Sequence, residues 1–182
     1  MLGFADEVWW SRLAQPAMHA WGEEPLRLAG HTADKADPDP KAVACYGLLR
    51  RDTGGMMLRF VAGRPVSHVT TAFLDWAWGE LAGEGKRVLL LVWDNAAWHV
   101  SKEVRGWVKS HNRRVRAAGG VRIRVCQLPV KAPWLNPIEP KWVHGKRAVA
   151  EPDRKLAAQE LMQRICDYYG CERLPPLAQK VD

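Results

Sequence analysis

The sequence predicts an α/β protein in which helices pack on a mixed β-sheet. Short apolar segments typical of strands alternate along the chain with longer segments that have helical periodicity. The segment 51–55 carries turn residues between two of the strand-like segments, which indicates a hairpin. The chain has 182 residues, of which 47% are apolar, and it is long enough to bury the core of one domain.

Each element follows from its residues. Strands are expected at residues 1–6, 42–49, 56–62, 88–93 and 121–128. Helices are expected at residues 68–82, 102–118 and 138–149 and after residue 153. Ser67, Ser101 and Asp153 are the expected N-caps, and Gly119 follows the second helix as its stop signal. Pro140 is tolerated only in the first turn of its helix. The Pro-rich tail from Leu174 is expected to fray.

Composition excludes several classes of protein. The longest strongly apolar run, 88–93, is too short to span a bilayer, and no signal peptide is recognisable at the start of the chain. The four cysteines form no CxxC pair, so we expect reduced, buried thiols and no zinc site. Most of the ten tryptophans are expected in the core.

The net charge of +7 is concentrated in one quarter of the chain. Residues 102–147 carry 12 basic and 2 acidic side chains, whereas the segments before and after them are close to neutral. Such a stretch indicates either a surface that binds a polyanion or a solvated helix face that happens to be basic.

Three acids occupy positions typical of catalytic groups. Asp6 ends the first expected strand, Asp94 follows the most apolar strand, and Glu139 opens a helix after a loop framed by prolines. Three converging carboxylates repel each other unless a cation lies between them, and oxygen ligands favour Mg²⁺ or Mn²⁺. Two such ions stabilise the attacking and leaving oxygens of a phosphoryl displacement. Taken singly, each acid also suits a turn or a helix terminus.

Two motifs carry a family resemblance. The segment 92–104 (VWDNAAWHVSKEV) resembles the second-aspartate motif of DDE-superfamily transposases, in the bacterial insertion-sequence branch related to mariner. The segment 128–142, with Asn136-Pro137-Ile138-Glu139, resembles the third-acid motif of the same family. Phe4-Ala5-Asp6-Glu7, followed by Trp21-Gly22, is similar to the first-aspartate segment. The resemblance covers about residues 1–150, with residues 151–182 expected to form a C-terminal helix and tail that pack on this domain.

The resemblance implies an RNase H-like mixed sheet with helices on both faces. It also implies two Mg²⁺ ions, with Mn²⁺ as a substitute, bound by the triad Asp6, Asp94 and Glu139. The implied activity is DNA strand cleavage by water, followed by strand transfer from the freed 3′-hydroxyl. Asn95 and His99 would then orient ligands or contact DNA, and Asn136 would shape the loop that presents Glu139. His99 also suits a core position.

DNA is the partner that the family implies. The cations expected to contact its phosphates are Lys102, Arg105, Lys109, Arg113, Arg114, Lys131, Lys141, Lys146 and Arg147. Trp134 and Trp142 are expected to pack in the protein instead of stacking on bases. We also expect partner subunits of a dimer or transpososome, and no membrane. The expected location is the bacterial cytoplasm, in association with the nucleoid.

Three departures from the family pattern leave alternatives open. Only five residues precede Asp6, so either the first strand is minimal or the protein starts earlier than this sequence. The helix-turn-helix region that the family places before the first aspartate is not found in these five residues. The interval of 44 residues between Asp94 and Glu139 is long for the family. One alternative is an inactive remnant that only binds DNA or other subunits. Another is a structure-selective nuclease that never joins a 3′-hydroxyl to a target.

Overall fold

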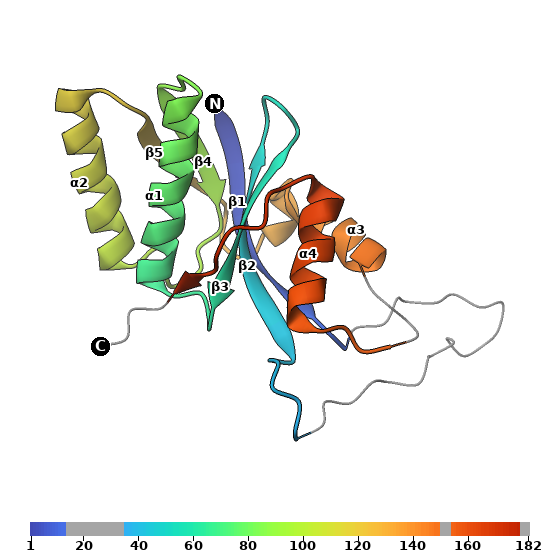
Figure 1. Ribbon diagram of the computed structural model, residues 1–182. Helices are drawn as coiled ribbons and strands as arrows, with labels where there is room; N and C mark the ends of the chain where they lie inside the picture. The colour runs from blue at the N-terminus through green and yellow to red at the C-terminus, as the bar shows by residue number, and fades with distance from the viewer. Residues whose placement is uncertain (14–34, 150–153, 179–182) are drawn as a thin grey trace.

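A six-stranded mixed sheet forms the centre of the computed structural model, which describes residues 1–13, 35–149 and 154–178 (Figure 1). Its strand order is β5-β4-β1-β2-β3-β6. The strands are β1 (Leu2–Ser11), β2 (Ala42–Arg50), β3 (Met56–Ala62), β4 (Val88–Trp93), β5 (Arg122–Gln127) and β6 (Leu177–Ala178).

The sheet combines two kinds of pairing. β1, β2 and β3 form an antiparallel meander, and its β2–β3 connection is the predicted hairpin. β4 pairs in parallel with β1 and with β5, so the carboxyl end of β4 lies beside the middle of β1. In this parallel part of the sheet, α2 (Lys102–Ala118) is the crossover connection from β4 to β5, as parallel pairing requires.

Helices cover both faces of the sheet (Figure 1). The helices are α1 (Ser67–Gly83), α2 (Lys102–Ala118), α3 (Glu139–Val149) and α4 (Ala158–Tyr169), and a 3₁₀ turn, η1 (Pro133–Leu135), precedes α3. One buried cluster joins the sheet to α1 and α2, and a second joins it to α3 and α4. The α/β fold with an RNase H-like mixed sheet and helices on both faces is therefore confirmed.

Alternation along β1 assigns its side chains to the two cores. Ala5 belongs to the cluster under α1 and α2, whereas Val8 and Trp10 belong to the cluster under α3 and α4. Asp6 therefore points to the α3 side, and Glu7 points to the side of α1 and α2. This difference determines the partners of the two acids.

Four local expectations were wrong. β1 extends to Ser11, so Asp6 lies inside the strand and not at its end. α1 starts at Ser67, after Val66, without a side-chain cap. α4 starts at Ala158 with Ala157 as its N-cap, so the expected cap at Asp153 was wrong. Trp21-Gly22 lies outside the described residues, as Asp153 does, and the expectation for Trp21-Gly22 stays untested. The tail does not fray at Leu177, because β6 pairs with β3.

Two of the four cysteines and the start of α2 agree with the expectations from the sequence. Cys45 and Cys166 are buried free thiols as expected, whereas Cys126 is exposed and Cys171 is half-buried. Ser101 caps α2 by accepting a hydrogen bond from the Val104 amide at 3.2 Å. In the part of the chain that the structure describes, no helix is both long and apolar enough to cross a membrane.

Candidate active site

The register of the sheet brings Asp6 and Asp94 to the same level. Phe4 of β1 pairs with Val92 of β4, and both acids lie two residues further along these parallel strands. Neighbouring strands of a sheet are about 4.8 Å apart. The register therefore directs the segment that carries Asp94 toward the level of Asp6 at the point where β4 ends.

Trp142 of α3 holds Asp6 in place. Its indole Nε1 donates to Oδ2 of Asp6 at 3.1 Å. Trp142 also packs across Gly47 of β2, which is the residue paired with Asp6. A Cβ atom added to Gly47 would lie only 2.3 Å from the indole ring. Burial, together with the nearby charges of Glu7 and Glu139, raises the pKa of Asp6 to about 7. A cation at this position would relieve that cost.

Asp94 is half-exposed, and one of its oxygens is held by two donors. Oδ1 accepts a hydrogen bond from the Ala96 amide at 2.9 Å and lies 2.8 Å from Nδ1 of His99. The hydrogen bond with His99 is the main reason that the pKa of Asp94 is lowered. Asp94 is therefore a charged carboxylate with one fixed oxygen.

His99 connects Asp94 to a second buried acid, Glu7. Its Nε2 lies 2.6 Å from Oε1 of Glu7, and its ring stacks on Trp93 with centroids 4.3 Å apart. Burial alone would lower the pKa of His99, but its hydrogen bonds to Asp94 and Glu7 outweigh this effect and raise it to about 9. The sequence prediction assigned no role to Glu7. Its only signal was a second acid directly after Asp6.

Asn136 and Asn95 position the segment that carries Glu139. The buried side chain of Asn136 donates to the Ala5 carbonyl at 3.0 Å, which ties the turn before α3 to β1 beside Asp6. Asn95 donates to the Leu128 carbonyl at 2.6 Å, which ties the start of the same segment to the end of β4. Both side chains therefore hold backbone segments close to the three acids.

Glu139 lies in the first turn of α3 and is half-buried. Burial raises its pKa, the charge of Lys146 opposes this shift, and the charge of Asp94 adds to it. Since Asp6 also responds to Glu139, Glu139 is within electrostatic reach of both Asp6 and Asp94.

The carboxylates fit a divalent cation only in part. Trp142 donates to Oδ2 of Asp6, and Asp6 also accepts a hydrogen bond from the Glu7 backbone. His99 and Ala96 hold Oδ1 of Asp94, and Oδ2 of Asp94 has no hydrogen-bond partner among the described residues, so it is left for a ligand. Hard oxygen donors of this kind suit Mg²⁺ or Mn²⁺. Among the described residues, however, no three His, Cys, Asp or Glu side chains already form a metal-binding group.

Most of the predicted DNA-contacting cations of α2 form one stripe. Lys102, Arg105, Lys109 and Arg113 recur at helical spacing on the exposed face, opposite the buried Val104. Arg114 lies off this stripe and faces α1. Its guanidinium is 6.0 Å from the Trp78 ring and 4.0 Å from Asp75.

The remaining predicted cations surround Glu139 in sequence and are also exposed. They are Lys131, Lys141, Lys146 and Arg147. Of the two tryptophans expected to pack, Trp142 is buried, but Trp134 is 74% exposed. That expectation was wrong for Trp134, which belongs to η1, a turn without a buried residue.

A family model described as DDE superfamily endonuclease matches residues 16–163, which contain Asp94 and Glu139 and begin after Asp6. The chain belongs to the DDE superfamily endonuclease family. Comparison with curated protein sequences gives no match.

Solved structures of Mos1 transposase share the fold of this DDE superfamily protein. The paired-end complex with the left transposon end has a TM-score of 0.67 at 12% identity, and the match covers 94% of this chain and 48% of that chain. The paired-end complex with Mn gives the same values. The catalytic domain of Mos1 mariner transposase has a TM-score of 0.60 at 11% identity, covering 94% of this chain and 70% of that one. The chain thus spans about half the length of the Mos1 chains in the two paired-end complexes.

Proposed function

We propose that this chain is the catalytic domain of a DNA transposase that cleaves DNA strands and joins the freed 3′-hydroxyl to target DNA. One observation carries the proposal. Asp6 in β1 and Asp94, directly after β4, follow the same parallel register, each has an oxygen held by protein donors, and Glu139 lies within electrostatic reach of both. Membership of the DDE superfamily supports this reading of the acids.

Asp6, Asp94 and Glu139 are the proposed ligands of two Mg²⁺ ions, with Mn²⁺ as a substitute. Such ions, when bound, stabilise the charge that develops on the attacking and leaving oxygens. The protein's own contribution is to fix the ligands. Trp142 orients Asp6, His99 orients Asp94, and Asn136 anchors the turn before Glu139. The Mos1 complexes solved with Mn support a divalent ion.

DNA is the proposed substrate, and its phosphates would contact the exposed cations of α2 and α3. The Mos1 complexes with transposon ends support this assignment. The same proposal includes partner subunits and membership of the bacterial insertion-sequence branch related to mariner. It also includes a cytoplasmic location in association with the nucleoid. We further propose that residues 1–150 form the catalytic unit, on which residues 151–182 pack.

A nicking assay tests the proposal. Supercoiled plasmid incubated with the chain and Mg²⁺ or Mn²⁺ should be nicked, and EDTA should prevent this. Asp94→Ala should abolish cleavage. Asp75→Ala is the matched control, because Asp75 is an exposed acid on α1 and its removal should leave the rate unchanged.

The alternatives give different outcomes. An inactive remnant would bind DNA in a salt-dependent manner without any cleavage. A nuclease of the same fold would cleave, but would not join a pre-cut 3′-hydroxyl end to a target plasmid. Cleavage that survives Asp94→Ala would refute the assignment of the acids.

A further inference from the structure

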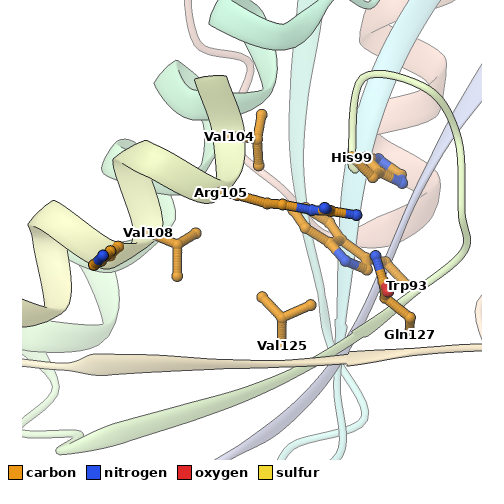
Figure 2. Close-up of a pocket in the computed structure, with 8 residues that line it drawn as sticks. Trp93, His99, Val104, Arg105, Val108, Val125 and Gln127 are labelled. Atoms are coloured by element: carbon orange, nitrogen blue, oxygen red, sulfur yellow. The ribbon is translucent and has the colours of Figure 1, made fainter. Parts of the chain in front are cut away.

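Of the tryptophans that the structure describes, two have exposed side chains, Trp9 and Trp134. The others are buried or half-buried. Trp93, for example, lines a pocket between α2 and β5 (Figure 2), but it is covered by the ring of His99, with centroids 4.3 Å apart. Trp134 is the more exposed of the two, with 74% of its surface in contact with solvent. Both faces of a large flat ring are therefore accessible only where the chain places Trp134 or Trp9.

Buried residues on both sides fix the turn that carries Trp134. Ala132 before η1 and Asn136 after it are buried, whereas all three residues of η1 are exposed. The Asn136 amide closes the turn by donating to the Pro133 carbonyl at 2.8 Å. The indole is thus carried by a backbone that is already ordered, and preorganisation of this kind lowers the entropic cost of binding a ligand.

The same turn is fastened beside the carboxylates. The Asn136 side chain donates to the carbonyl of Ala5, the residue before Asp6, at 3.0 Å. Trp134 is two residues before Asn136, so the Cα atoms of these two residues lie within about 7 Å of each other. On the other side, the Glu139 amide donates to the Asn136 carbonyl at 3.1 Å. The backbone of Trp134 therefore lies close to the candidate active site.

Charge and area indicate the class of ligand. The segment 104–138 contains no Asp or Glu, and the exposed cations Lys131 and Lys141 come three residues before and seven residues after Trp134. An indole offers roughly 200 Å² of surface. This is far below the about 800 Å² that each partner contributes to a stable protein interface. A flat apolar group joined to an anion suits this surface better, and the bases of a nucleic acid strand have this chemistry.

We propose that Trp134 stacks on one unpaired base of the bound DNA strand, with Lys131 and Lys141 compensating the charge of the neighbouring phosphates. This inference rests on the proposed function and deepens it, because it assigns a contact to a base and not only to the backbone. Stacking on an aromatic side chain is largely independent of sequence, since every base has a flat face. A base held by Trp134 fixes one nucleotide of the strand relative to the turn that precedes Glu139.

Binding of a labelled single-stranded oligodeoxynucleotide, measured by fluorescence anisotropy in EDTA, tests the inference. Trp134→Leu keeps an apolar side chain but removes the flat ring, and it should weaken binding about tenfold, the loss typical of one stacked base. Trp134→Phe keeps a ring and should restore most of the affinity. A fully abasic strand of the same length should bind equally to the parent and to Trp134→Leu.

Trp9→Leu is the matched control, because it removes the other exposed tryptophan and should leave binding unchanged. Both side chains are exposed, so the variants should keep the melting temperature of the parent.

Three results would overturn the inference and leave the proposed function standing. The first is that Trp134→Leu binds both strands as the parent does, or loses affinity equally for both strands. The second is that Trp134→Phe is as weak as Trp134→Leu, or that Trp9→Leu is equally weak. The third is that the parent binds duplex DNA but not the single strand, or that Trp134→Leu binds DNA normally and loses the parent's oligomeric state in analytical ultracentrifugation, which would assign the indole to a partner subunit. If the parent binds no DNA at all, the proposed function fails together with this inference.

Discussion

The Nε2 atom of His99 lies 2.6 Å from Oε1 of Glu7, and the two side chains are 1% and 6% exposed. The other ring nitrogen lies 2.8 Å from Asp94. A carboxylate as buried as Glu7 is stable only when it is paired. His99 therefore has two functions, because it compensates the charge of Glu7 and fixes the orientation of Asp94.

His99→Ala should lower the free energy of unfolding by about 3–5 kcal/mol, because it leaves the charge of Glu7 buried without its partner. Urea unfolding at neutral pH measures this change. His144→Ala removes an exposed histidine from α3 and should change stability by less than about 0.5 kcal/mol. Similar stabilities for the two variants would mean that the Glu7–His99 contact contributes little to folding.

The stability of the protein should decrease between pH 7 and pH 9 because of His99. Its pKa is about 9 in the folded protein and 6.5 in the unfolded chain. The folded state therefore holds this proton more tightly, so the stabilisation is complete below pH 6.5 and is lost as the pH rises through 9. Urea unfolding of the parent should show this decline, and His99→Gln should flatten it. The pH range stops at 9 because burial also raises the pKa of Cys45 and Tyr46, which would add a decline of the same sign. An equal slope in both proteins would exclude His99 as the cause.

The elements of the fold were largely predictable because their signals are local. The apolar run 88–93 gave β4, the turn chemistry at 51–55 gave the β2–β3 hairpin, and Ser101 gave the start of α2. The extent of β1 was not predictable. Its central place depends on pairing with β2 and β4, which are distant in sequence.

The same distinction holds for the candidate site. Asp94 and Glu139 were recognisable from the segments around them, and His99 was recognisable as part of a motif. The common level of Asp6 and Asp94 depends on strand register, and the role of Glu7 depends on the face of β1 to which it points. Neither property is encoded by neighbouring residues. The exposure of Trp134 likewise follows from its place in η1, whose residues are all exposed, and not from its own hydrophobicity.

Gly47→Ala should destabilise the protein and impair Asp6. A Cβ atom at this position would lie 2.3 Å from the Trp142 ring, so the indole that donates to Asp6 has to move. Overpacking of this kind costs about 1–3 kcal/mol, which urea unfolding measures. Gly79→Ala is the matched control, since nothing lies within 4 Å of its added Cβ and the helix α1 should gain about 0.5–1 kcal/mol. If both alanines are tolerated equally, Trp142 does not depend on the space over Gly47.

Asp6→Asn should stabilise the metal-free protein while it abolishes cleavage. Burial and the charges of Glu7 and Glu139 raise the pKa of Asp6 to about 7, so above that pH the charged carboxylate is a cost that the amide does not carry. The gain should be about 1–3 kcal/mol in EDTA at pH 8, measured by urea unfolding. Added Mn²⁺ should raise the stability of the parent and leave Asp6→Asn nearly unchanged, because a ligand stabilises only the state that binds it. A parent that is more stable than Asp6→Asn in EDTA, or equal stabilisation of both proteins by Mn²⁺, would show that Asp6 is a structural acid and not a metal ligand. Either result would leave only Asp94 and Glu139 as candidate ligands.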